Sequence, residues 1–476
     1  MRARLGLAAA LLAAVAGSAA AKPLPDCPSG AARAVQVAQV AGRPLHYRIC
    51  AGTLPIRIDG EVRGRIFYTA YLAARTDRLK RPLAFVWNGG PGSDSRPLQF
   101  HALAPRTLRD GQLADNGASP LDTADLVFVD PVGTGFSRPV RPDYGKDFYG
   151  TNEDIASIAQ FVRTFRDVYH RADAPLYLVG ESFGTWRAAG VAETLIDQGA
   201  PVAGIALISG GIPLGETHDR ALMRALSLPN RTATALALGK LAPELQAHPK
   251  KTLADAEAWA RRVYDPALEH PQALSSADRK AVIEGLARYQ GLPASTIDPE
   301  TLWVSPRQFR TDLLKAGGET LNVFDMRKIG EDKPDPADDR AVIDFYRRTL
   351  GYTDGHYAGI EEKGPEVGSL WRYDQAPITP ESLARAKAGE GPPSPSRPWT
   401  LRAMEREPAL RVWVAAGMYD SLNSCAGNRA TVAALPAGIA ERFSLHCYAG
   451  GHMMYDDPAV AQPFGADLRR FLGGGR

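Results

Sequence analysis

The sequence lacks the features that would assign it to a nucleic-acid-binding or membrane-spanning class. Its 56 basic and 53 acidic residues nearly balance, giving a net charge of +3 with no basic stripe. Proteins that bind nucleic acid concentrate positive charge on one face or segment, so we expect no such partner. Beyond the N-terminus, no apolar run approaches the roughly 20 residues that a bilayer span needs. With 45% hydrophobic residues over 476 positions, the chain can bury a large core.

The first residues follow the order of a secretory signal. Arg2 and Arg4 precede an apolar stretch from Leu5 to Ala16, and small residues continue to Ala21. This order predicts a signal peptide over residues 1–21 and an exported protein, periplasmic or secreted. The apolar stretch is too short for a membrane anchor, so none is expected after cleavage.

The chain has few cysteines, and all four fit an oxidising compartment. Four cysteines in an exported protein predict two disulfides, with three possible connectivities. We favour pairing between neighbours in the sequence, Cys27 with Cys50 and Cys425 with Cys447. The alternative is four free, buried thiols.

Short apolar runs rich in β-branched and aromatic residues recur through the first half of the chain. Helix-period stretches at Asn152–Tyr169 and Thr185–Ile196 separate the later runs. This alternation predicts an α/β fold with a mostly parallel central sheet and helices on both faces. The stretch Arg65–Ala74 alternates more and is expected to form an antiparallel edge. The runs are Ile66–Leu72, Leu83–Trp87, Leu126–Asp130, Leu176–Val179 and Ile205–Ile208.

After Pro213 the sequence becomes charged, helix-prone and interrupted by proline. We interpret residues 214–404 as a largely helical cap insertion that ends near a linker-like run, Gly389–Pro395. Residues 22–213 and 405–476 are then the two parts of the core. The second part contains two strand-like runs and a terminal helix, at Leu410–Ala415, Arg442–Tyr448 and about Pro458–Leu472.

The strongest local signal is a G-x-S-x-G motif, Gly180–Gly184, with Ser182 at its centre. It lies between a predicted strand and a predicted helix. A serine on a sharp strand-to-helix turn exposes its hydroxyl near a helix N-terminus, as in the nucleophile elbow of the α/β-hydrolase fold. We therefore interpret Ser182 as a nucleophile. The alternative is an ordinary Gly-Ser turn.

A nucleophilic serine needs an imidazole to take its proton and a carboxylate to orient that imidazole. In this fold the acid and then the histidine follow the serine, each on a loop after a late strand. Asp420 and His452 stand in those places, which completes a predicted triad with Ser182. The competitors are His446, inside a strand pattern, and His356, inside the insertion. The structural alternatives are a turn-forming aspartate and a loop histidine.

A glycine-rich loop, Asn88–Gly92, follows the predicted strand that ends at Trp87. Acyl transfer creates an oxyanion that backbone N–H groups must stabilise, and glycines let the main chain approach it closely. One donor is expected from this loop and the other from the amide of Phe183. A Gly-Pro-Gly run can also be a plain turn.

Together these segments resemble the serine carboxypeptidases. The resemblance implies an α/β-hydrolase fold, hydrolysis of C-terminal residues from peptides, and Gly90 and Phe183 as oxyanion donors. It also implies that Asn88, Gly89 and Glu181 bind the terminal carboxylate of the substrate. The segments that carry it are Asn88–Gly92, Asp130–Ser137, Gly180–Gly184, the Asp420 loop and Gly450–Met453.

The implied carboxylate site requires Glu181 to carry a proton. A nearby like charge raises the pKa of a carboxyl, so an acidic operating range is expected for substrate binding. Eukaryotic members of the family have a second acid where this chain has Ala102. A structural alternative for Glu181 is a spacer chosen only for turn geometry.

The expected partner is a peptide with a free C-terminus. The alternatives are a secreted serine esterase or acyltransferase, an aminopeptidase of the same fold, and a non-catalytic binding protein. No metal-ligand set, phosphate-binding loop or haem motif is present in the sequence, so we expect no cofactor and no metal. The sequence does not indicate an oligomeric state or a preferred side chain.

Overall fold

The computed structural model describes residues 26–74, 80–215, 219–373, 380 and 397–475. The predicted signal peptide, residues 1–21, and the linker-like run 389–395 lie outside the described residues.

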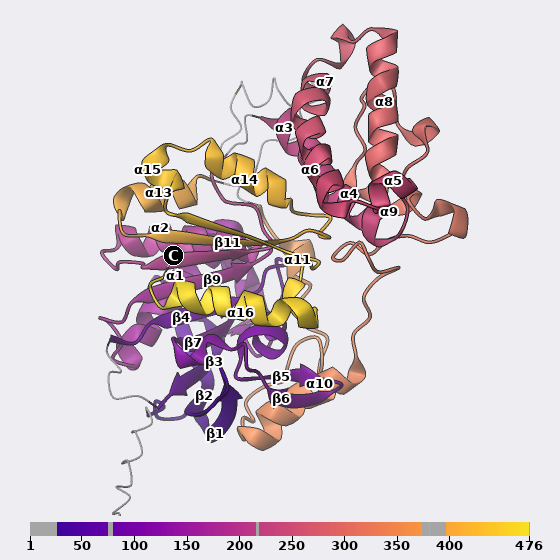
Figure 1. Ribbon diagram of the computed structural model, residues 1–476. Helices are drawn as coiled ribbons and strands as arrows, with labels where there is room; N and C mark the ends of the chain where they lie inside the picture. Colours follow the sequence, from indigo (N-terminus) through magenta and orange to yellow (C-terminus); the bar gives the residue numbers. More distant parts are fainter. Residues whose placement is uncertain (1–25, 75–79, 216–218, 374–379, 381–396, 476) are drawn as a thin grey trace, which may run out of the picture.

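The core is a large mixed sheet with the strand order β1-β2-β3-β7-β4-β9-β10-β11-β12. From β7 onward all neighbours are parallel, whereas β1, β2, β3 and β7 pair in antiparallel fashion. The short strand β8 (Arg138–Pro139) pairs with β3, and β5 (Arg106–Arg109) with β6 (Gln112–Asp115) in a separate ribbon. This arrangement is the α/β-hydrolase fold that the sequence predicts (Figure 1). The strands of the main path are β1 (Ala32–Val40), β2 (Arg43–Ile58), β3 (Glu61–Ala73), β4 (Leu83–Trp87), β7 (Asp125–Asp130), β9 (Leu176–Glu181), β10 (Gly204–Ile208), β11 (Arg411–Gly417) and β12 (Phe443–Tyr448).

The expectation for Arg65–Ala74 is half right. The run forms β3, which is antiparallel to both neighbours, but β3 is internal and β1 is the edge. Strand β2 pairs with β3 over most of its length. The sequence does not reveal β2, because polar residues such as Arg43 and Arg48 interrupt its apolar pattern. A half-buried strand of this kind needs few consecutive apolar residues.

Helices cover both faces of the sheet. On one face α1 (Thr151–Val168), α2 (Gly184–Asp197) and α13 (Trp399–Arg406) pack over one hydrophobic core. On the other face α16 (Pro458–Leu472) packs over a second core. The parallel strands β4, β7, β9, β10 and β11 between these layers are buried on both sides, which explains their continuous apolar runs.

The segment between β10 and β11 is helical, as expected (Figure 1). Its first part has a separate hydrophobic core, whereas α10 and the turn after it pack against the core that α16 also covers. The predicted boundary at residue 404 falls within α13, which packs on α2. Within the described residues, no helix has both the length and the apolarity to cross a bilayer. Besides α13, the α-helices among the described residues of this segment are α3 (Arg220–Ala225), α4 (Leu228–Ala237), α5 (Pro243–Gln246), α6 (Pro249–Trp259), α7 (Asp265–Glu269), α8 (Ser276–Gln290), α9 (Pro306–Asp312), α10 (Pro336–Asp344) and α11 (Val367–Leu370).

Candidate active site

The predicted nucleophile sits on a strained turn between β9 and α2. Ser182 has a φ of 56°, in the left-handed region that residues other than glycine rarely adopt. A Cβ at Gly180 would lie 2.0 Å from the carbonyl oxygen of Gly184, so the turn closes only with glycine at position 180. The amide of Ser182 donates to the carbonyl of Ile208, 2.8 Å away at the end of β10. The local geometry is that of a nucleophile elbow.

The predicted acid and base are in contact. Asp420 follows β11 and His452 follows β12, and Nδ1 of His452 lies 2.8 Å from Oδ2 of Asp420. The two residues are only 1% and 2% exposed. Burial acts to lower the pKa of His452, but the charge and hydrogen bond of Asp420, with the charge of Glu181, raise it above its ordinary value. The pair can therefore stabilise an imidazolium.

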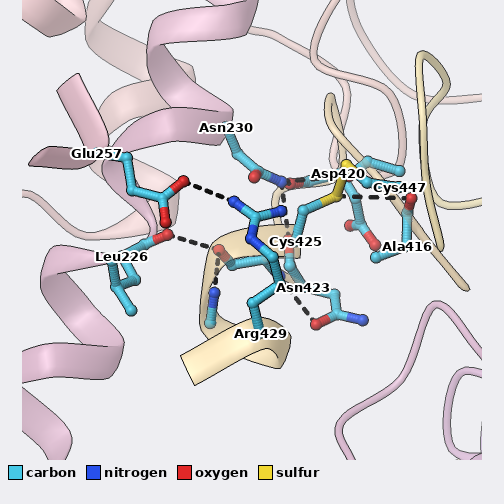
Figure 2. The surroundings of a disulfide bond; sticks show 12 residues. Leu226, Asn230, Glu257, Ala416, Asp420, Asn423, Cys425, Arg429 and Cys447 are labelled. Atoms are coloured by element: carbon cyan, nitrogen blue, oxygen red, sulfur yellow. Dashed lines mark hydrogen bonds and ion pairs between the residues drawn. A yellow bond between two sulfur atoms is a disulfide. The ribbon is translucent and has the colours of Figure 1, made fainter. Parts of the chain in front are cut away.

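The insertion and a disulfide both hold the loop that carries Asp420 (Figure 2). Asn230 of α4 donates from Nδ2 to three backbone carbonyls, those of Gly417, Asp420 and Asn423, at 3.2, 3.1 and 2.9 Å. The disulfide Cys425–Cys447 joins α14 (Cys425–Ala433), which follows this loop, to β12, which precedes His452. Both predicted disulfide pairings are confirmed, the other being Cys27–Cys50.

Ser182 and His452 are both held at the end of β10. Ile208 accepts a hydrogen bond from the amide of Ser182, and the next residue, Ser209, donates its hydroxyl to the carbonyl of His452. No hydrogen bond joins Ser182 to His452 in this structure. Nε2 of His452 is buried without a hydrogen-bond partner among the described residues, which leaves it available to a reacting hydroxyl. Catalytic hydrogen bonds often tighten only when substrate binds.

The glycine loop lies against the elbow. A Cβ at Gly89 would be 2.5 Å from the amide nitrogen of Phe183. Across the described parts of the chain, no backbone carbonyl accepts from the amides of Gly90 or Phe183, so both donors are available to an oxyanion.

Two buried contacts fix Asn88 at the start of this loop. Its Oδ1 accepts from the amide of Leu98 at 3.0 Å, and its carbonyl accepts from Nη1 of Arg187 at 2.7 Å. Arg187 belongs to α2 and pairs with Asp154 of α1, with 2.6 Å between Nε and Oδ2. The helix that follows the elbow therefore also positions the glycine loop.

Glu181, directly before Ser182, is 3% exposed and lies close to the base. The hydroxyl of Tyr455 donates to its Oε2 at 2.5 Å. Burial raises the pKa of Glu181 to about 7, against the opposing effects of His452, Tyr455 and Asn88, while the charge of Asp456 raises it further. The main cause is therefore burial, to which the like charge of Asp456 adds.

A hollow adjoins the His452 loop and the insertion. Phe324, from the insertion, accepts a hydrogen bond from the amide of His452 at 2.6 Å, and the two rings lie 5.3 Å apart. Asp456, which lines the hollow, also raises the pKa of Glu181. Its lining comprises Phe324, Asp325, Arg327, Lys328, Asp332, Gly451, Met453, Asp456, Asp457 and Pro458.

The competing histidines have other contacts. His446 lies 2.8 Å from the hydroxyl of Ser444 and 3.2 Å from Asp467, and the backbone carbonyl of His356 accepts from Arg138. Sequence reasoning missed Asn230 and Tyr455, since neither stands in a recognisable motif.

The fold and this arrangement of loops place the protein in the α/β-hydrolase class. Residues 45–205 match the family described as Serine carboxypeptidase. The match ends after the elbow, before the segments that carry Asp420 and His452.

Two curated relatives show the extent of this similarity. Pheromone-processing carboxypeptidase KEX1 of Verticillium alfalfae is 28% identical over 162 residues, 34% of this chain and 24% of that protein. Carboxypeptidase sxa2 of Schizosaccharomyces pombe is 29% identical over 176 residues, 32% of each chain. The chain thus spans about a quarter to a third of the length of these relatives. A haloalkane dehalogenase variant from Bradyrhizobium elkanii aligns over 90% of this chain and 97% of its own, with 13% identity and a TM-score of 0.36. So low a score adds nothing to the fold assignment, which rests on the strand order.

Proposed function

We propose that this protein is a serine-type carboxypeptidase that removes C-terminal residues from peptides through an acyl-enzyme. The observation that carries the proposal is the buried carboxyl of Glu181, which directly precedes Ser182 and has a pKa of about 7. An acid that is neutral in mildly acidic solution can donate a hydrogen bond to a carboxylate. An esterase acting on uncharged esters would have no need of such a group.

In the proposed reaction, Oγ of Ser182 bonds to the carbonyl carbon of the scissile peptide while its proton passes to Nε2 of His452. Asp420 keeps the imidazole oriented through Nδ1, and the amides of Gly90 and Phe183 stabilise the oxyanion. As the C–N bond breaks, the proton moves from Nε2 to the departing amine of the terminal residue. Water then attacks the acyl ester with His452 as base, and the shortened peptide leaves.

The terminal carboxylate of the substrate is assigned to Asn88, Gly89 and the neutral form of Glu181. Protonation of Glu181 also removes a negative charge that raises the pKa of His452. The acid that binds the carboxylate therefore helps the base to stay neutral at the same pH.

An esterase, an acyltransferase or an aminopeptidase would use the same acyl-transfer groups. Ala102, at the position of the family's second acid, favours the first two because it weakens the carboxylate site. An aminopeptidase would instead require Glu181 to be ionised, so that it could bind an amine. The pH dependence of substrate preference separates these alternatives.

We also propose that the protein is exported. Both disulfides support an oxidising compartment, and the N-terminal residues have the pattern of a secretory signal. The proposal covers either a periplasmic or a secreted location.

The decisive experiment compares a blocked dipeptide that has a free terminal carboxylate with its amide and with a simple aryl ester. We expect kcat/KM at pH 5 to be at least tenfold higher for the acid than for the amide, with Ser182→Ala inactive on all three. Equal rates on the acid and the amide would overturn the carboxypeptidase assignment. Ester cleavage alone would support the esterase alternative.

A further inference from the structure

Tyr455 holds the carboxyl of Glu181 from the far end of the sequence. It lies three residues after His452, in a short 3₁₀ turn, η11 (Met454–Asp456), and is 1% exposed. Its hydroxyl donates to Oε2 of Glu181 at 2.5 Å. Its ring packs against Phe464 of α16, with 5.7 Å between ring centroids. The loop of the predicted base therefore also carries the partner of the predicted carboxylate-binding acid.

The hydroxyl keeps its proton throughout the range in which Glu181 titrates. Burial is the main cause that holds the pKa of Tyr455 well above its ordinary value, and the charges of Glu181 and Asp456 act in the same direction. Asn88 acts to lower the pKa of both Tyr455 and Glu181, so these three buried side chains lie together. The hydrogen bond between Tyr455 and Glu181 fixes one arrangement of the pair.

A carboxyl group with two equivalent oxygens can carry its proton on either. When one oxygen already accepts a hydrogen bond from a hydroxyl, the proton is favoured on the other. We propose that Tyr455 is a positioning residue for carboxylate recognition: its hydroxyl occupies Oε2 of Glu181, so that the neutral acid carries its proton on Oε1 and donates it to the substrate. This inference rests on the proposed carboxypeptidase function.

The groups around Glu181 determine whether loss of the Tyr455 hydroxyl raises or lowers the pKa of Glu181. Donation from Tyr455 lowers the pKa of Glu181, as do His452 and Asn88, whereas burial and the charge of Asp456 raise it. Asp456 in turn faces His101, Lys328 and Arg109 and the carboxylate Asp332. Loss of the hydroxyl should therefore raise the pKa of Glu181 while leaving its proton unoriented.

The test is Tyr455→Phe, which keeps the ring against Phe464. For a free-acid dipeptide at pH 5, we expect KM to rise roughly ten- to hundredfold. This is the size of one lost hydrogen bond from Glu181 to the charged carboxylate of the substrate. The kcat on the aryl ester should stay within about twofold. Difference infrared spectra, with Glu181→Gln as reference, should place the titration of Glu181 at higher pH than in the wild type.

Tyr448→Phe is the matched control. It removes a tyrosine hydroxyl that donates to another carboxylate, Asp467 at 2.8 Å, and should change neither KM nor the titration of Glu181. An unchanged titration of Glu181 in Tyr455→Phe, or a KM no different from the wild type, would overturn the inference. Equal losses on acid and ester would do so too, because they indicate a purely structural role.

The failures of the two proposals can be told apart. If the wild type does not prefer the acid to the amide, the carboxypeptidase assignment fails without any variant. If the wild type shows that preference and Tyr455→Phe retains it with the same KM, only the role of Tyr455 fails.

Discussion

Replacing Glu181 by glutamine removes a titratable carboxyl from the proposed carboxylate site and keeps its size. The pKa of about 7 means that Glu181 is about 99% neutral at pH 5 and about 90% ionised at pH 8. The wild type should therefore lose about tenfold in binding of a free-acid substrate between pH 6 and pH 8. An ordinary glutamate, with a pKa near 4.3, would already be mostly ionised at pH 5.

In Glu181→Gln the carbonyl oxygen of the new amide can accept from Tyr455, which leaves the NH₂ group to donate to the substrate. The variant should keep binding at pH 5 and lose the alkaline fall.

The assay is kcat/KM from pH 4 to pH 9 on the free-acid dipeptide, with the aryl ester as control. The ester should show only the acidic limb of His452 in both proteins. A variant that keeps the alkaline fall of the wild type on the acid substrate would refute the assignment of that fall to Glu181.

Three further predictions concern the loops that hold Asp420 and His452. Asn230→Ala leaves two buried carbonyls and one partly buried carbonyl without their donor. It should cost about 2 kcal/mol in urea unfolding and lower kcat more than it changes KM; unchanged stability and kcat would contradict it. Replacing Cys425 and Cys447 together by serine should lower the free energy of unfolding by about 3 kcal/mol for a loop of this size, whereas a loss below about 0.5 kcal/mol would argue against the cross-link. Gly417→Ala places a Cβ 2.0 Å from the carbonyl oxygen of Gly451 and should lower Tm and activity together. The control Gly438→Ala, with open space around it, should change neither. A tolerated alanine at 417 would count against the tight packing of the Asp420 and His452 loops.

The parallel half of the fold could be predicted because its strands are buried on both faces. Strands β4, β7, β9 and β10 consist of continuous apolar runs, and the glycine loop and elbow follow directly after two of them. The antiparallel strands β1 and β2 could not be recognised. Along β1, partly buried residues alternate with exposed ones, and the exposed Val35 and Val37 hide that alternation in the sequence. Along β2, polar residues such as Arg43 and Arg48 interrupt the apolar pattern.

The predicted contact between Asp420 and His452 follows from chain order in this fold, and the structure contains it. The contacts that hold these residues in place join distant parts of the chain, and no rule of chain order predicts them. Tyr455 meets Glu181 across 274 residues, and Asn230 reaches Asp420 from within the insertion. The cause of the raised pKa of Glu181 was also hidden, since burial is a property of the folded chain.

The central claim is that Ser182 is a nucleophile activated by His452. Its most direct test is labelling with a fluorophosphonate probe, followed by intact mass and peptide mapping. The account predicts a single adduct on Ser182 in the wild type, none in Ser182→Ala, and a rate at least a hundredfold lower in His452→Ala. A folded wild-type protein that takes no label, or takes it on another residue, would contradict it.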